Sequence, residues 1–78
     1  MNLLYSMVIQ WSEEDACFVV SLPEFAELVK QPCTDGKTYE EAVQKGQEAI
    51  ASLIEWLQAE GMPLPEPKTI PQQPLSVV

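Results

Sequence analysis

The sequence contains no histidine and no arginine, and its only basic residues are four lysines. Without histidine, the chain lacks the side chain that most often transfers protons in catalysis and that commonly binds metals. Without arginine, it lacks the forked donor that reads bases and phosphates. Twelve acidic residues leave a net charge of -8, so direct binding to nucleic acid is not expected.

Cysteine and glycine are also scarce, with two and three residues respectively. Cys17 lies in an apolar run and Cys33 near a turn, and neither has a histidine to activate it, so neither is expected to be a nucleophile. There is no glycine-rich phosphate loop, and the acids Glu13, Glu14 and Asp15 do not match the spacing of a calcium loop. We therefore expect no catalysis, no metal and no cofactor.

The N-terminal stretch "MNLLYSMVIQW" has no basic flank, no long apolar run and no small-residue cleavage site. It predicts no membrane contact and favours the cytoplasm, with two free thiols. The 78 residues suffice for one domain. Its core is thin, because a chain of this size buries only about 60 to 65% of its unfolded surface.

An alternating apolar pattern occupies the first third of the chain. Residues 3–11 predict a strand whose apolar face consists of Leu3, Tyr5, Met7, Ile9 and Trp11. A polar cluster interrupts the pattern, and residues 16–22 then predict the second strand of a hairpin. Pro23 ends that strand, and residues 28–33 predict a short third strand that Pro32 confines to an edge or an end.

The second half of the chain predicts one long helix. Residues 35–36 indicate a turn, and Thr38 followed by Glu41 is a capping box, which satisfies backbone donors of the first helical turn. Apolar residues then recur at three- and four-residue spacing, which predicts a helix from about residue 39 to 60. The apolar stripe consists of Ala42, Val43, Gly46, Ala49, Ile50, Leu53, Ile54 and Leu57.

The end of this helix is marked by Gly61, which suits a left-handed cap with Met62 folding back on Leu57. Gly46 lies within the apolar stripe and predicts a close approach of helix to sheet; a merely tolerated glycine is the alternative. Five prolines follow Gly61 and force an extended chain. We expect this tail to lie along the domain and to add a short strand near residues 68–71.

These elements predict an α+β fold, in which an antiparallel sheet of three to four strands carries one long helix on one face. The second sheet face carries Leu4, Val8, Cys17 and Val19, and no further element remains to cover it. This half-apolar face and the thin core predict a homo-oligomer, either a dimer or a tetramer. The expected interface residues are Leu4, Val8, Val19 and Trp56.

The order and spacing of several segments resemble the HicB-like family, the antitoxin half of HicA–HicB toxin-antitoxin pairs. The matching segments are Trp11, Glu13 to Asp15, Pro23-Glu24, Gly36 to Ala42, Glu48-Ala49-Ile50 and Gly61 to Pro67. The resemblance covers roughly residues 3–67 and implies a β-β-β-α-β order, a reduced RNase H-like fold. It divides the chain into a HicB-like domain, residues 1–67, and a proline-rich tail, residues 68–78.

Two departures from the family pattern concern the loop after Pro23-Glu24 and the C-terminus. "FAELVKQP" replaces the Pro-Gly step that usually follows the Pro-acid pair. Many HicB proteins carry a DNA-binding segment after the domain, whereas only "KTIPQQPLSVV" follows here, so the chain resembles the stand-alone form.

The resemblance implies an antitoxin that binds a small HicA-type toxin and covers its RNA surface and catalytic histidine. The alternative is a homo-oligomeric HicB-like adaptor or regulator without a toxin partner. A remnant nuclease comes third, because two-magnesium chemistry needs carboxylates on the strands and residues 3–11 contain none.

The excess of acidic residues predicts a basic protein partner, although a generic acidic surface of a soluble protein is the alternative that composition alone favours. The acids expected to face this partner are Glu13, Glu14 and Asp15 on the hairpin, and Glu24 and Glu27 after the second strand. The large side chains nearest to these acids or to the helix edge are Trp11, Phe25 and Trp56. They would anchor the partner unless they belong to the core, which is what we expect for Trp11.

Overall fold

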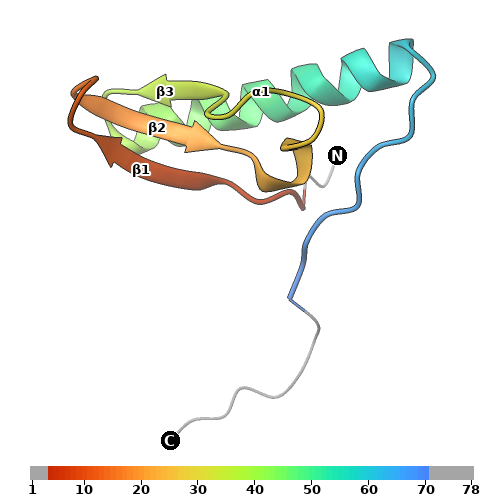
Figure 1. Ribbon diagram of the computed structural model, residues 1–78, viewed down its shortest axis with the longest axis horizontal. Coiled ribbons are helices and arrows are strands. Elements are labelled where there is room, and N and C mark those ends of the chain that lie inside the picture. Colours follow the sequence, from red (N-terminus) through yellow and green to blue (C-terminus); the bar gives the residue numbers. More distant parts are fainter. Residues whose placement is uncertain (1–3, 71–78) are drawn as a thin grey trace, which may run out of the picture.

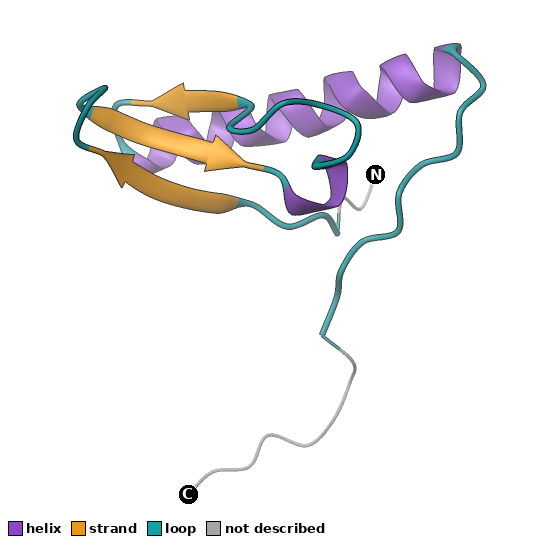
Figure 2. Cartoon of the chain, viewed as in Figure 1, coloured by secondary structure: helices purple, strands orange, loops and turns teal. Residues whose placement is uncertain are grey.

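The computed structural model describes residues 4–70, which form a three-stranded antiparallel sheet with one long helix on one face (Figure 1). The elements are β1 (Val8–Ser12), β2 (Cys17–Ser21), a short 3₁₀ helix (Pro23–Phe25), β3 (Thr34–Gly36) and α1 (Tyr39–Ala59). The strands lie in the order β1-β2-β3, and Figure 2 shows the helix behind them. The predicted α+β class is therefore confirmed.

The strand β1 begins at Val8, later than the predicted start at residue 3, and Leu3 lies outside the described residues. Tyr5, Met7 and Ile9 pack against the core, as their alternation predicts. The expectation of a buried Trp11 was wrong, since this side chain is 52% exposed. The physical reason is the position of α1, which packs mainly over β3 and β2 and leaves the end of β1 uncovered.

The third strand is formed by residues 34–36, of which residues 35–36 were predicted to be a turn, and the predicted strand at residues 28–33 was wrong. Gln31 explains why residues 28–33 form no strand, because its side-chain amide makes the hydrogen bonds to Leu22 that a paired strand would otherwise make with its backbone. Its Oε1 accepts from the Leu22 N–H at 2.8 Å, and its Nε2 donates to the Leu22 carbonyl at 3.1 Å. Pro32 has no N–H to donate, so strand pairing begins only after it.

The helix α1 starts at the predicted cap. Thr38 Oγ1 accepts a hydrogen bond from the Glu41 N–H at 3.1 Å. The Glu41 carboxylate accepts in turn from the Lys37 N–H at 3.1 Å, one residue earlier than in the usual capping box. Two backbone N–H groups at the start of the helix are thereby satisfied by side chains that are close in the sequence.

The helix end also follows the prediction. Gly61 has a φ of 68°, its N–H donates to the Gln58 carbonyl at 3.1 Å, and the Met62 N–H donates to the Leu57 carbonyl at 2.9 Å. These two hydrogen bonds define a Schellman cap, which satisfies carbonyls of the last turn.

The core lies between the sheet and one stripe of α1. Its most buried apolar residues are Val20, Leu22, Phe25, Ala42, Ile50, Ile54 and Leu57. Val43, predicted to belong to the stripe, is 37% exposed. Gly46 confirms the predicted close approach, because a Cβ there would overlap Met7 Sδ and lie 3.2 Å from Val20 Cγ1. Gly36 is in close contact with the backbone of α1, since a Cβ added at this position would lie 2.5 Å from the backbone nitrogen of Ala42.

Within residues 62–70, the chain after Gly61 is held against the domain at Pro65 and Lys68, as predicted for this part of the tail. The Tyr5 hydroxyl donates to the Pro65 carbonyl at 2.7 Å, and the Lys68 N–H donates to Glu24 Oε2 at 2.8 Å. Residues 68–70 form no strand, and residue 71 of the strand predicted there lies outside the described residues.

Glu24 joins three segments of the chain. It is 8% exposed, and its carboxylate accepts from the Ser6 N–H at 3.1 Å and from Ser6 Oγ at 3.0 Å, in addition to the Lys68 N–H. Burial raises the pKa of Glu24, but these hydrogen bonds outweigh it, and the pKa lies below its ordinary value. The folded protein therefore favours the carboxylate.

We predict that Glu24→Gln lowers the free energy of unfolding by about 1 to 3 kcal/mol at neutral pH, because an amide cannot accept all of these hydrogen bonds. A depressed pKa stabilises the fold above the pKa of the unfolded chain, and this contribution is lost as the pH falls through the folded-state pKa. The difference between wild type and variant should therefore shrink on acidification in urea titrations. The exposed Glu27→Gln is the matched control, and an equal loss in both variants would contradict the assignment.

We also predict that Gly36→Ala destabilises the protein by about 1 to 3 kcal/mol, because the added Cβ meets the backbone of Ala42 and not a movable side chain. The neighbouring exposed Asp35→Ala should change the stability by less than about 0.5 kcal/mol. Thermal unfolding followed by circular dichroism compares the two, and similar midpoints would show that α1 does not press on β3.

Candidate functional site

A row of aromatic rings joins the hairpin to the first turn of α1. Trp11 and Phe18 lie edge to face with ring centroids 5.0 Å apart, and Phe18 and Tyr39 have centroids 4.2 Å apart with an interplanar angle of 31°. Trp11 is 52% and Tyr39 63% exposed, whereas Phe18 is partly buried. Val43 lies one turn further along α1. We refer to Trp11, Phe18, Tyr39 and Val43 as the hairpin–helix surface.

The exposure of this surface has two causes: the alternation of side chains along the strands, and the position of α1 on the sheet. Trp11 and Phe18 are cross-strand partners on the sheet face that carries α1. Since α1 lies mainly over β3 and β2, the inner face of β1 is open at this point. Exposed large apolar side chains that contact one another are typical of binding surfaces. The sequence did not reveal Tyr39 as part of it, although Tyr39 precedes the buried Ala42 by one helical turn.

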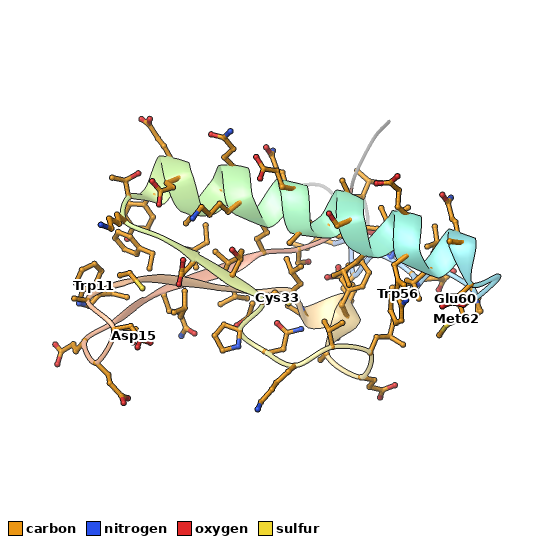
Figure 3. The ribbon with its side chains drawn as sticks, turned by 90° about the horizontal axis from the view of Figure 1, so that it is seen from above. Trp11, Asp15, Cys33, Trp56, Glu60 and Met62 are labelled. Atoms are coloured by element: carbon orange, nitrogen blue, oxygen red, sulfur yellow. The ribbon has the colours of Figure 1, made fainter. Side chains whose placement is uncertain are left out.

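Acidic side chains border this surface. Glu13, Glu14 and Asp15 are exposed on the loop that follows β1, and Figure 3 shows Asp15 and Trp11 at the same end of the molecule. Ser12 Oγ donates to Asp15 Oδ2 at 3.1 Å and accepts from the Asp15 N–H at 3.2 Å, which fixes the loop. Ala16 closes it with a φ of 53°.

A shallow depression of about 490 Å³ continues the surface along α1. It is lined by Tyr39, Glu40, Val43, Gln44 and Gln47. Glu40 is the one charged residue that lines the depression. The aromatic row therefore has an acid on this side as well as on the side of the hairpin loop. The surface therefore has an apolar centre with acids on two sides, which suits a partner that is both basic and apolar.

Two of the residues expected to face a partner lie inside the protein. Phe25 is fully buried and packs on Tyr5 with ring centroids 4.9 Å apart, and Glu24 is engaged by Ser6 and Lys68. The reason is the 3₁₀ helix, in which the Phe25 N–H bonds to the Leu22 carbonyl and turns both side chains inward. We therefore remove Glu24 and Phe25 from the expected partner contacts.

Glu27 is exposed, but it does not join the hairpin acids. It follows the end of β2, whereas Glu13, Glu14 and Asp15 precede the start of that strand. A five-residue strand separates the two groups by roughly 17 Å. Of the acids predicted to face a partner, only Glu13, Glu14 and Asp15 lie together on one surface.

The four residues expected in a homo-oligomer interface do not form one surface. Leu4, Val8 and Trp56 are 53%, 41% and 42% exposed, and Val19 is partly buried. Val8 and Val19 lie on the sheet face away from α1, next to the polar Gln10, which pairs with Val19. Trp56 lies on α1, which packs on the opposite face of the sheet, so it does not share a surface with the valines.

The two cysteines are free, as expected. Burial raises the pKa of both thiols, and Asp35 and Asp15 add to the shift at Cys17. A raised pKa leaves little of the nucleophilic thiolate at neutral pH. Among residues 4–70, no three histidine, cysteine or acidic side chains are grouped so that they could hold a metal ion. Nor does this part of the chain contain a helix long and apolar enough to cross a membrane.

The sequence matches no family model, no curated protein and no solved structure. The likeness to the HicB-like family thus rests on the segments described above.

Substitution of the two aromatic residues Phe25 and Trp11 should reduce stability to different degrees, because the first is buried and the second is exposed. Phe25→Ala should cost about 3 to 5 kcal/mol of unfolding free energy, because it empties a fully buried site. Trp11→Ala should cost only about 0.5 to 1.5 kcal/mol, since it removes an exposed ring and one aromatic pair. Urea unfolding measures both, and a Trp11 variant as unstable as the Phe25 variant would place Trp11 in the core.

Proposed function

We propose that this protein is a HicB-like antitoxin, a cytoplasmic binding protein whose hairpin–helix surface captures a small basic HicA-type toxin and masks its RNA surface. The observation that carries the proposal is the exposed aromatic row from Trp11 to Tyr39, which has acids on both sides. A protein that cleaves RNA presents a positive surface to the phosphates. That surface is the complement of an apolar centre with an acidic rim.

Charge and apolar contacts contribute differently to the proposed complex: charge sets the rate of encounter, and apolar contacts supply the binding energy. The net charge of -8 and the acids at Glu13, Glu14 and Asp15 attract a basic partner and raise the rate of encounter. Exposed ion pairs contribute only about 0 to 1 kcal/mol each, so they do not hold the complex together. Trp11 and Tyr39 are residue types that carry much of the binding energy in interfaces, and they lie at the centre of the surface.

The strand residues favour binding over a remnant nuclease. Two-metal hydrolysis needs carboxylates that converge from neighbouring strands. Asp35 is the single acid in β1, β2 and β3, and it pairs with Val19 on the sheet face away from α1. We therefore propose a binding role without catalysis.

The element order supports a relationship to the reduced RNase H-like fold. Three antiparallel strands precede the helix, and the extended segment after it is held beside Tyr5 and Glu24 through Pro65 and Lys68. This is the order that the HicB resemblance implies, with an extended segment in place of the last strand. A homo-oligomeric adaptor is the second candidate function, and it is favoured by the edge of β1, along which no other strand of residues 4–70 lies.

We predict that reversing Glu13, Glu14 and Asp15 to lysine slows association with the toxin about tenfold or more at low salt. The dissociation rate should change little, because it depends on the apolar contacts. The partner to be tested is the product of a short basic reading frame with a single histidine, sought next to this gene, and stopped-flow fluorescence measures both rates. For the wild type, added salt should slow association in the same way.

The matched control reverses Glu48 and Glu55 on α1 and Glu60 at its C-cap, which are all exposed and change the net charge equally. An equal slowing in both triple variants would mean that only the net charge matters. Trp11→Ala should accelerate dissociation while leaving association nearly unchanged. If it does not, or if co-expression of the wild type fails to protect cells from the toxin, the proposed function is wrong.

A further inference from the structure

The shallow depression along α1 has a mixed lining. Its volume is about 490 Å³, and its lining residues are Tyr39, Glu40, Val43, Gln44 and Gln47. Because residues four apart are neighbours on a helix surface, Tyr39 and Val43 form one row of this lining, and Glu40 and Gln44 form the next. The depression therefore offers an aromatic ring and methyl groups directly beside a carboxylate and amides.

The Tyr39 ring is covered on one side by Phe18, whose ring centroid lies 4.2 Å away at an interplanar angle of 31°. Tyr39 is nevertheless 63% exposed, and it lines the depression. The face of an aromatic ring carries negative charge density, which attracts a cation within about 6 Å of the ring centroid. The part of the Tyr39 ring that Phe18 leaves open is therefore suited to a positive group.

Glu40 is an acid without an ion-pair partner among the described residues. Its neighbour Glu41 accepts from the Lys37 N–H at 3.1 Å and lies 3.8 Å from Lys45 Nζ. Among residues 4–70, no lysine and no hydrogen-bond donor engages the Glu40 carboxylate, which is exposed. One of these two adjacent acids is thus used within the fold, and the other is available to a cation from outside.

The two glutamines add hydrogen-bond acceptors to the depression. Gln44 Nε2 donates to Glu48 Oε2 at 3.4 Å. In the part of the chain that the structure describes, no donor reaches the side-chain oxygen of Gln44 or Gln47. The lining also contains no lysine. A ligand that is positively charged and donates several hydrogen bonds matches this combination of groups.

We propose that the depression binds an arginine side chain of a basic partner protein, with the guanidinium over the Tyr39 ring and against the Glu40 carboxylate. The methylene stem of the arginine lies along Val43. A guanidinium is planar and delocalised, so it stacks on rings and presents parallel donors to a carboxylate, which the compact ammonium of lysine does not do. The remaining N–H groups of the guanidinium reach the oxygens of Gln44 and Gln47.

The charges around the first turns of α1 favour a cation at this place. The start of a helix carries a partial positive charge, which opposes a cation but falls off within the first turn. Glu40 and Glu41 both lie in that turn, and Glu48 follows two turns later. The lysines nearest in sequence are Lys37, which precedes the helix cap, and Lys45, which lies beside Glu41. The carboxylates outnumber the lysines here, as they do in the whole chain.

This inference rests on the proposed function, because it assigns one side chain of the same partner. It also restricts what that partner is. The aromatic row continues from Tyr39 through Phe18 to Trp11, so the partner carries an apolar side chain next to its arginine. A partner that is basic only through lysine does not satisfy the proposal.

The first test uses the full chain and N-acetyl-arginine amide, with the NMR chemical shifts of the backbone amides as the readout. We expect a dissociation constant on the order of millimolar and shifts centred on residues 39–47. The lysine counterpart should bind at least about threefold more weakly. The citrulline counterpart has the same shape without the charge and should not bind measurably. Equal binding of the arginine and lysine probes, or shifts centred elsewhere, would overturn the proposal.

Variants identify the groups that hold the probe. Glu40→Gln should raise the dissociation constant of the arginine probe about two- to fivefold. The exposed Glu55→Gln changes the net charge equally and should leave it unchanged. Tyr39→Leu should raise the constant about two- to fivefold, and Tyr39→Phe should recover most of the loss, because the ring face and not the hydroxyl attracts the cation. Circular dichroism checks that each variant is folded, and equal effects of Glu40→Gln and Glu55→Gln would contradict the site.

Measurements with the basic toxin separate this inference from the proposed function. If the toxin binds and neither Tyr39→Leu nor Glu40→Gln weakens its binding more than Glu55→Gln does, the proposed function stands and the arginine site is wrong. If the arginine probe binds as expected but the toxin does not bind, the guanidinium site stands and the proposed partner is wrong.

Discussion

The position of α1 on the sheet decides which apolar side chains of this small protein are buried and which are exposed. Two glycines fix that position, because a Cβ on Gly36 would meet the backbone of Ala42 and one on Gly46 would overlap Met7. The first turns of the helix therefore sit directly on β3 and beside Val20. A single helix placed there cannot also cover the hairpin end of β1, so Trp11 is exposed while Ile9 packs against the core.

The two ends of the molecule differ because the helix is longer than the sheet. Its 21 residues span roughly 31 Å, while the longest strands have five residues and span roughly 17 Å. Beyond the sheet, Phe25 fills the core and Glu24 ties the 3₁₀ helix to Ser6 and Lys68. The end of the molecule that contains Phe25 and Glu24 is stabilised by burial and hydrogen bonds. The aromatic rings at the hairpin end are therefore not needed in the core to stabilise the fold.

Periodicity and capping residues predict the hairpin and the helix with both of its ends, because those features depend on neighbours in sequence. Errors arose where distant contacts decide the outcome. Gln31 satisfies Leu22 with its side chain and shifts the third strand, and alternation alone could not reveal this. Trp11 has the period of a core residue but lies beyond the reach of α1, and Glu24 looks like a surface acid until Ser6 and Lys68 surround it.

The hairpin presents two kinds of groups that belong to the same residues. The backbone of Ile9 and Trp11 points out of the sheet edge, whereas the Trp11 ring lies on the face that carries α1 and contacts Phe18. The acids Glu13, Glu14 and Asp15 follow β1 directly and are exposed at the same end of the molecule as Trp11 (Figure 3). A negative field and an apolar ring therefore reach the solvent side by side, which is the arrangement in which charge raises the rate of encounter and apolar contact supplies the affinity.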